Sequence, residues 1–302
     1  MTGRRPAVSA RAIVWERRRR SWQNLWGQFR RSRSGMLGLG VIAVFAALAL
    51  LAPILFDHSQ LDVTKATGQV YEAPSAQFWL GTDDSGRNVL ALVVWGARIS
   101  LLVGLCATVL SMFIGTAVGI ASGHYRGLAG GVLDRLTDWF LVIPFLPLAI
   151  VLATVLGKSL LNIIIVIGVT SWPATARLIR AQTLSVEGRP YLERAKALGS
   201  GDLHQMTRHV LPNVMPLVLA NTTLAVSICI LSETTLSFLG LGDPTAVSWG
   251  TILDDAFAGG AISAGAWWYL AAPGICVVLV VLAFNLVGRA LEGILDPRRA
   301  HE

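Results

Sequence analysis

Charged residues and cysteines are scarce in this sequence, and both shortages restrict the class of protein it encodes. Only 14% of the 302 residues are charged, whereas 54% are apolar and the mean hydropathy is +0.60. Soluble domains carry about 25% charged residues, so this composition excludes an ordinary soluble fold. Cys106, Cys229 and Cys276 fall in apolar stretches, spaced neither as a CxxC pair nor as a metal cluster. We expect them to be small buried residues and expect no metal site.

The sequence also lacks the residues that ATP chemistry or peptide-bond hydrolysis requires. Gly157-Lys158-Ser159 is the only trace of a phosphate-binding loop, and Leu152 stands where the first glycine of that motif belongs. An intramembrane protease would need a GxSG motif with a histidine at matching depth, and the sequence has none. We therefore expect no catalytic residue and no enzyme activity in this chain.

Long apolar stretches are what the sequence has in abundance. A bilayer core about 30 Å thick needs roughly 20 apolar residues per helix, and six stretches satisfy this. They lie near residues 36–56, 99–122, 132–156, 160–181, 214–238 and 268–291. The first follows a leader too long for a signal peptide, so we expect an uncleaved span. The prediction is an all-α membrane protein with six transmembrane helices.

The basic residues predict the orientation of these helices. The net charge is +7, and all but four of the 25 lysines and arginines fall on one side of the six predicted spans. The exceptions are Lys65, Arg87, Arg98 and Lys158. Because basic residues concentrate in cytoplasmic loops, we expect both termini in the cytoplasm.

Four regions follow from this topology. Residues 1–35 form a predicted cytoplasmic basic arm, 36–97 the first span and an extracytoplasmic loop, 98–292 a core of five spans, and 293–302 a cytoplasmic tail. Within the arm, aromatic and leucine residues recur at helical spacing opposite arginines: Trp15, Trp22, Leu25, Trp26 and Phe29. This pattern is typical of an interfacial helix on anionic lipid. A nucleic-acid arm is the alternative for residues 17–20, but we expect no nucleic-acid partner.

Small residues and prolines mark special positions within the spans. Gly115, Gly119 and Gly123 lie four apart and predict a seam for close helix packing, without indicating which helix it meets. Pro144, Pro147 and Pro173 predict interruptions of helical hydrogen bonding. Two further residues, Arg135 and Asp138, are spaced either to pair on one helix face or to form a solvated helix end.

Few polar groups lie inside the predicted spans. A secondary transporter or channel would need ionisable residues at mid-membrane, so this class is the less favoured alternative. Glu233 lies near the outer end of the fifth span; we favour a structural role, with contact to a partner helix or to the translocation path as the alternative. Asn221 is a second weak candidate for that path.

A polar segment, residues 188–212, separates the fourth and fifth spans on the predicted cytoplasmic side. Residues 191–198 favour a helix, residues 199–201 a break, and Asp202 is placed to cap a second short helix ending before Pro212. A short helix outside the bilayer meets no lipid, which favours a protein partner. On charge alone, an ordinary solvated connection is the alternative.

The order of residues in this segment resembles the EAA loop of permease subunits of ATP-binding-cassette (ABC) importers. That loop runs Glu, Ala, Ala, three residues, Gly, nine residues, an apolar residue, one more, Leu and Pro. The matching positions are Glu193, Ala195, Gly199, Leu211 and Pro212. Arg194 replaces the first alanine, and His209 replaces a frequent isoleucine. The phrase RHVLPN, from Arg208, is similar to that of peptide-importer permeases.

Further phrases extend the resemblance over residues 36–298. They are GTDDSGRNVL with GARISL, the pattern Arg135, Asp138 and Pro144, ETTLSFLGLG with SWGTIL, and the closing LDPR. Together they resemble the C-type permease of the dipeptide and oligopeptide ABC importer family. The resemblance implies a type I importer transmembrane-domain fold in the bacterial inner membrane.

Several partners are implied by the same resemblance. They are a homologous B-type permease, two cytoplasmic ATPases or one fused or heterodimeric pair, an extracytoplasmic solute-binding protein, and membrane lipid. ATP and Mg would bind to the ATPases, and this chain would hold no cofactor. Di- or oligopeptides are the expected cargo, and glutathione, nickel complexes or haem are the alternatives.

The resemblance also implies a coupling role for the polar segment. Glu193 would contact the ATPase rim, Gly199 would form a tight turn, Leu198 and Leu211 would pack the segment, and Pro212 would start the fifth span. The full set of predicted coupling residues is Tyr191, Glu193, Arg194, Ala195, Leu198, Gly199, Asp202, Arg208, His209, Leu211 and Pro212.

Overall fold

The computed structural model describes residues 23 and 26–295, and this part of the chain is built from helices, with no β-strand and one isolated bridge between Thr82 and Asn88. Most of the predicted basic arm, including Trp15, Trp22 and Leu25, lies outside the described residues, as does the tail from residue 296. Trp26 and Phe29 stack in a helical turn just before the first long helix, with ring centroids 5.9 Å apart.

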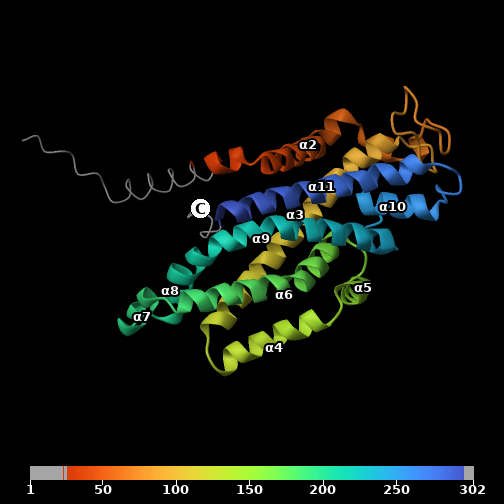
Figure 1. Ribbon diagram of the computed structural model, residues 1–302. Coiled ribbons are helices and arrows are strands. Elements are labelled where there is room, and N and C mark those ends of the chain that lie inside the picture. The colour runs from red at the N-terminus through yellow and green to blue at the C-terminus, as the bar shows by residue number, and fades with distance from the viewer. Residues whose placement is uncertain (1–22, 24–25, 296–302) are drawn as a thin grey trace, which may run out of the picture.

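Five long apolar helices cross most of the molecule (Figure 1). They are α2 (Arg33–Leu55), α3 (Val89–His124), α6 (Leu160–Glu187), α9 (Leu211–Leu236) and α11 (Trp267–Leu295). Their positions confirm five of the predicted apolar spans. The second begins ten residues earlier than expected, because Asn88 caps α3 by accepting a hydrogen bond from the Leu90 amide at 3.0 Å. The predicted regional boundary between residues 97 and 98 therefore falls inside α3.

The predicted third span, 132–156, is not a single helix. It consists of α4 (Leu128–Val142) and α5 (Phe145–Leu156), which meet at 93°. Pro144 is the residue before α5, and Ile143 has the extended backbone that a following proline favours. The sequence predicts an interruption here, but the structure turns the chain through a right angle. The described residues thus contain five candidate spans, or six if the bent pair is one broken span.

The glycine seam of α3 faces α6. A Cβ atom at Gly115 would lie 2.8 Å from the Trp172 carbonyl oxygen, and one at Gly119 would lie 2.6 Å from the Ala176 carbonyl oxygen. A Cβ atom at Gly123 would lie 2.8 Å from Cβ of the Thr183 side chain. These approaches are too close for any side chain, so the seam allows the two helix backbones to touch. The structure thereby supplies the partner that the spacing alone left open.

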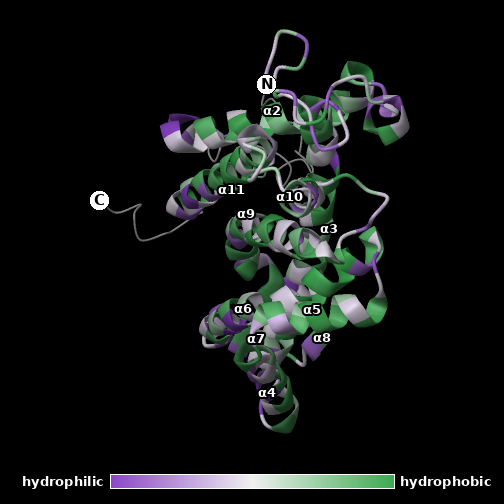
Figure 2. Cartoon of the chain, turned by 90° about the vertical axis from the view of Figure 1, so that its right-hand side faces the viewer, coloured by the Kyte–Doolittle hydropathy of each residue, from purple (hydrophilic) through white to green (hydrophobic). Residues whose placement is uncertain are grey.

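Two ion pairs connect α4 to α6. Asp138 Oδ1 lies 2.5 Å from Arg177 Nη2, and Asp134 Oδ1 lies 3.1 Å from Arg180 Nε. Asp138 therefore pairs across two helices and not with Arg135 on its own helix. Hydropathy colouring shows that the long helices are predominantly apolar, whereas the two short helices that follow α6 carry hydrophilic residues (Figure 2).

The two ends of the bundle carry different structures (Figure 1). One end has α7 (Pro190–Ala197) and α8 (Asp202–Gln205), which lead through the π-helical turn η3 (Met206–Val210) into α9. At the other end lie the 3-10 turns η1 (His58–Leu61) and η2 (Val63–Lys65), the π-helical turn η4 (Ser237–Leu241) and α10 (Trp249–Ala258). The polar segment of residues 188–212, which we call the coupling segment, and the loop of residues 57–88 thus lie at opposite ends of the bundle, as predicted.

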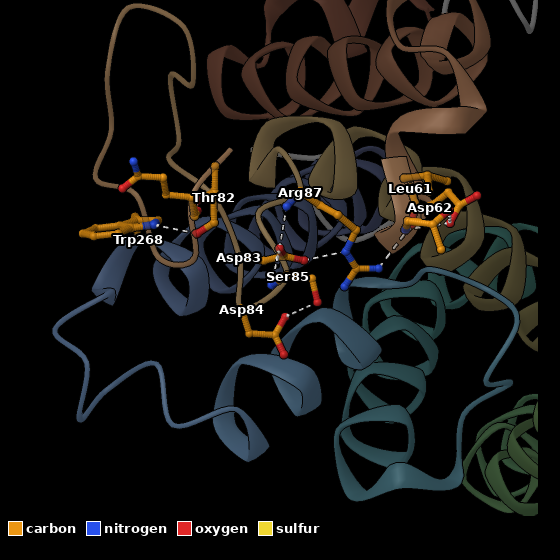
Figure 3. A network of polar contacts seen from close by, with 10 residues as sticks. Leu61, Asp62, Thr82, Asp83, Asp84, Ser85, Arg87 and Trp268 are labelled. Atoms are coloured by element: carbon orange, nitrogen blue, oxygen red, sulfur yellow. Dashed lines mark hydrogen bonds and ion pairs between the residues drawn. The ribbon is translucent and has the colours of Figure 1, made fainter. Parts of the chain in front are cut away.

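A buried carboxylate organises that loop (Figure 3). Asp83 Oδ1 accepts hydrogen bonds from the Ser85 and Arg87 amides, and its Oδ2 lies 2.6 Å from Arg87 Nε. Arg87 Nη1 donates to the Leu61 carbonyl oxygen at 3.3 Å, and Trp268 Nε1 donates to the Thr82 carbonyl oxygen at 3.2 Å. The loop is thus fixed to itself and to the start of α11, which supports a structural role for its turn-rich sequence.

Candidate functional site

The first half of the polar segment is the short helix α7. It begins with Pro190, where the missing amide hydrogen would have had no helical partner. Glu193 lies in its first turn and Lys196 in its last, an arrangement that complements the helix dipole. Leu192 is fully buried in a cluster with Val210 and other apolar residues from α3, α6 and α9. This side chain anchors α7 to the end of the bundle.

A tight turn at Gly199 ends α7. The Gly199 amide donates to the Lys196 carbonyl oxygen at 2.9 Å, and the Ser200 amide donates to the Ala195 carbonyl oxygen at 3.0 Å. This is a Schellman motif, in which the residue after the helix takes a left-handed conformation. Gly199 has φ +80°, while within the described residues no atom would lie within 4 Å of a Cβ there. Backbone conformation alone therefore favours glycine at this position.

The second half of the segment continues into the fifth span without a break. Gly201, not Asp202, is the cap of α8, and Asp202 makes no side-chain capping bond to the described backbone. α8, η3 and α9 then follow one another directly, and Pro212 lies in the first turn of α9. The predictions of an Asp202 cap and of a separate helix ending before Pro212 are therefore wrong. The physical reason is that Met206–Val210 forms a π-helical turn, which keeps the chain helical.

A buried polar cluster ties the segment to two spans. His124, at the end of α3, and Glu187, at the end of α6, are both almost fully buried, with Nδ1 and Oε1 2.6 Å apart. Glu187 Oε2 accepts a 2.5 Å hydrogen bond from Lys196 Nζ of α7. Asp202 Oδ1 of α8 lies 3.4 Å from His124 Nε2. We call these four residues the inner-end cluster. Sequence reasoning missed it, because no local spacing signals a contact between residues so far apart in the chain.

The tip of the segment exposes apolar side chains. Leu198 and Leu203, on either side of the Gly199 turn, are 88% and 72% exposed. Leu198 was expected to pack the segment, which is wrong; Leu192 and Val210 fill that role, and Leu211 is half-buried against the same cluster. Large apolar side chains raised on a polar loop are typical of a surface that contacts another protein.

Charged and aromatic side chains surround these leucines. Glu193, Arg194 and Arg208 are exposed, Ala195 is half-buried, and Tyr191 is exposed at the margin. The His209 ring lies between those of Tyr191 and His204, with centroid distances of 6.2 and 5.7 Å. The tip therefore combines an apolar centre with a polar rim, as protein interfaces do.

The two polar candidates within the spans occupy different settings. Glu233 is fully buried and accepts hydrogen bonds of 2.9 Å from Ser100 and Ser237, while Ser100 Oγ accepts one from the Trp249 amide. It thus joins α9, α3 and α10 in the packed interior. Asn221 lies near the middle of α9, half-buried, and donates to Thr175 Oγ1 of α6 at 3.1 Å. In the described part of the chain, no cluster of His, Cys, Asp and Glu is arranged to hold a metal ion.

Apolar helices long enough to span a bilayer, with an exposed apolar tip fixed to one end of the bundle, are typical of a membrane subunit that contacts another protein. Residues 115–301 match the family described as binding-protein-dependent transport system inner membrane component, and residues 21–74 match the N-terminal TM domain of oligopeptide transport permease C. The chain belongs to the family of binding-protein-dependent transport system inner membrane components. It is therefore a multi-pass permease subunit of a bacterial inner-membrane ABC importer, with the type I importer fold, and not an enzyme.

Similar proteins align over nearly the full length of the chain. The dipeptide transport system permease protein DppC of Haemophilus influenzae is 36% identical, covering 91% of this chain and 94% of the relative. The di/tripeptide transport system permease protein DppC of Pseudomonas aeruginosa is 37% identical, covering 91% and 92%. The glutathione transport system permease protein GsiD of Pectobacterium atrosepticum is 31% identical, covering 93% and 92%. Importers of this kind work with ATPase and binding-protein partners.

Proposed function

We propose that this chain is the C-type permease of an importer of di- or oligopeptides and that it forms half of the translocation path with a homologous B-type permease. The names of the relatives at 36–37% identity and the match to the oligopeptide permease C domain support the peptide cargo. Glutathione is itself a peptide, and the relative at 31% identity makes it the second candidate. Both termini lie in the cytoplasm in this proposal, in agreement with the positive-inside pattern.

The observation that supports a coupling role is the exposure of Leu198 and Leu203 on either side of the tight turn at Gly199. Leu198 and Leu203 would enter an apolar groove of a cytoplasmic ATPase, while Glu193 and Arg194 would meet the polar rim of that groove. The ATPases, either two subunits or one fused or heterodimeric pair, would bind ATP and Mg. Their closure would move α8 and, through the continuous helix, α9.

The opposite end of the bundle would receive an extracytoplasmic binding protein. The loop of residues 57–88, fixed by Asp83 and Arg87, lies beside α10 there, and Tyr71 Oη donates to the Gly259 carbonyl oxygen at 2.6 Å. These contacts keep the loop and α10 in fixed positions, so that a binding protein would meet a preformed surface. The cargo would then pass from that protein into the path between the two permeases.

Reconstitution of the complete importer in proteoliposomes tests the cargo. The complex should take up radiolabelled trialanine only when its binding protein and ATP are both present, and trialanine should stimulate ATP hydrolysis. Glutathione should be taken up more slowly under the same conditions. Uptake of glutathione but not of any di- or tripeptide would contradict the peptide proposal and favour the alternative.

Copurification tests the coupling tip. Leu198→Asp should abolish retention of the ATPases on the tagged permease pair, because a carboxylate cannot enter an apolar groove without a large desolvation cost. The matched control is Leu128→Asp, since Leu128 is 90% exposed but lies at the start of α4, outside the polar segment. Equal ATPase retention by the two variants would show that the tip is not the dock.

A further inference from the structure

A hollow of about 100 Å³, lined by both polar and apolar residues, lies between α3, α6 and α9. Its polar lining consists of Ser111 from α3, Ser171 and Thr175 from α6, and Asn221 and Cys229 from α9. In the described part of the chain, no charged side chain lines it. Three spans therefore place residues with hydroxyl and amide groups around one small space, beside the apolar residues Leu224, Ala225 and Ile228.

This hollow lies at membrane depth. At 1.5 Å per residue, Ser171 is roughly 16 Å along α6 from Leu160 and roughly 24 Å from Glu187. Polar side chains at such depth normally face the bundle interior or a water-filled path. Ile228, which borders the hollow, is 59% exposed, and Ala174 on the facing helix is exposed as well. The hollow therefore opens onto the surface of the subunit.

Several polar groups in the hollow retain hydrogen-bonding capacity. Asn221 Nδ2 donates a hydrogen bond to Thr175 Oγ1, but the side-chain oxygen Oδ1 of Asn221 accepts none from the residues that the structure describes. Ser171 Oγ is buried and likewise has no partner among them. Unsatisfied polar atoms in a membrane interior are costly, which favours a site that is wetted or filled by a polar ligand.

We propose that this hollow contacts the main chain of the transported peptide, an inference that rests on the proposed peptide cargo. A peptide group offers one N–H donor and one C=O acceptor; Asn221 Oδ1 accepts from the first, and the Ser171 hydroxyl, which has no partner among the described residues, donates to the second. A space of about 100 Å³ is large enough to hold a small polar group. Because the lining has no charge, the contact is indifferent to side-chain charge and to the peptide termini. Such a contact lets cargoes of different sequence pass without binding tightly.

Cysteine protection in the assembled importer tests this contact. All three native cysteines are replaced by alanine, and Ser171→Cys is introduced into that background. The expected result is that 2-aminoethyl methanethiosulfonate modifies Cys at this position, that modification lowers trialanine uptake at least fivefold, and that saturating trialanine with binding protein slows the modification at least threefold. Ala174→Cys, at the exposed edge of the hollow, is a second reporter in case the first variant does not assemble.

The matched control is Phe113→Cys, two residues from Ser111 on α3 with a 74% exposed side chain. Its modification rate should be unaffected by trialanine. In a cysteine-containing chain, Asn221→Leu should lower trialanine uptake severalfold while ATPase retention on the complex stays unchanged. If the unaltered importer transports trialanine but both reporters react at the same rate with and without it, only the proposed contact is overturned. If the unaltered importer transports no peptide, the peptide cargo and the contact both fall.

Discussion

His124 and Glu187 are 63 residues apart in the chain, yet the imidazole Nδ1 and the carboxylate Oε1 lie within 2.6 Å of each other. The contact joins the end of α3 to the end of α6 just where the glycine seam between these helices finishes. Lys196 and Asp202 reach the same pair from the two halves of the coupling segment. On the proposed coupling role, movement of the tip would therefore reach α3 and α6 through side chains as well as α9 through the backbone.

Replacing the carboxylate of the inner-end cluster should uncouple the importer. Glu187→Gln removes the negative charge that faces Lys196, and breaking a largely buried pair by removing one partner costs several kcal/mol. Part of Lys196 is exposed, so water can solvate its ammonium group in the variant. We therefore expect a smaller loss in the free energy of unfolding, about 1–3 kcal/mol. The number of trialanine molecules transported per ATP hydrolysed should fall severalfold in proteoliposomes.

The control for this variant is Asp138→Asn, which breaks the exposed pair with Arg177. Exposed pairs contribute about 0–1 kcal/mol, so its transport ratio should match that of the unaltered chain. A ratio lowered equally by both substitutions would argue against a special role for the inner-end cluster.

The turn after α7 should not tolerate a Cβ atom at Gly199. Gly199→Ala forces an L-residue into φ +80°, at a cost of about 1–2 kcal/mol, and should reduce both ATPase retention and transport. Gly201→Ala is the matched control, because Gly201 has φ −71° and equally open surroundings among the described residues. Equal loss of ATPase retention in the two variants would show that conformation at Gly199 is not what matters.

The α3–α6 seam should be intolerant of even a methyl group. Gly119→Ala would place a Cβ atom 2.6 Å from the Ala176 carbonyl oxygen, so we expect destabilisation of about 1–3 kcal/mol and a lower midpoint of thermal unfolding in detergent. The matched control is Gly131→Ala. Gly131 lies in α4, and no described atom is within 4 Å of the Cβ that this substitution adds. This variant should leave the midpoint unchanged or raise it, because alanine favours a helix by up to about 1 kcal/mol over glycine.

Asp243 predicts a pH-dependent contribution to stability. Hydrogen bonds from Thr245 hold the pKa of its carboxyl below the ordinary value of 3.8, and its Oδ2 also accepts from the Leu160 amide at the start of α6. A lowered folded-state pKa stabilises the protein above 3.8, and this contribution is lost as the pH falls from there through the folded pKa. Asp243→Ala should cost about 1 kcal/mol at pH 7.

Thermal unfolding in detergent at several pH values measures this effect. The difference in unfolding midpoint between Asp243→Ala and the unaltered chain should be constant from pH 5 to 7 and shrink below pH 3.8. A difference that instead grows as the pH falls would contradict the assignment of a lowered pKa to Asp243.

Local pattern predicted the elements that depend on short stretches of chain. Apolar length alone located α2, α6 and α11, and the spacing of Glu193, Gly199 and Pro212 located the coupling segment. The direction of the chain after Pro144 was beyond such reasoning, because a proline specifies an interruption but neighbouring helices set the angle. Exposure of Leu198 was missed for a similar reason, since the hydrophobicity of a residue does not say whether its partner lies on the same chain.

Long-range polar contacts were the least predictable part of the site. His124 ends a long apolar helix and Glu187 follows another, and neither residue type nor spacing indicates that they meet. Asp202 is a residue whose type predicted the wrong contact. Aspartate often caps a helix, but here its side chain makes no capping bond and lies 3.4 Å from His124 Nε2. The packing of α3 on α6 decides both outcomes.

The helical run that begins at Asp202 continues without a loop to the kink at Gly240, where φ is +72°. At 1.5 Å per residue it is roughly 57 Å long, so a tilt of one degree about one end displaces the other by about 1 Å. Its far arm carries Glu233, which holds Ser100 and, through that hydroxyl, the first amide of α10. On the proposed coupling role, a small displacement of the tip would therefore reach the opposite end of the subunit without passing through a loop.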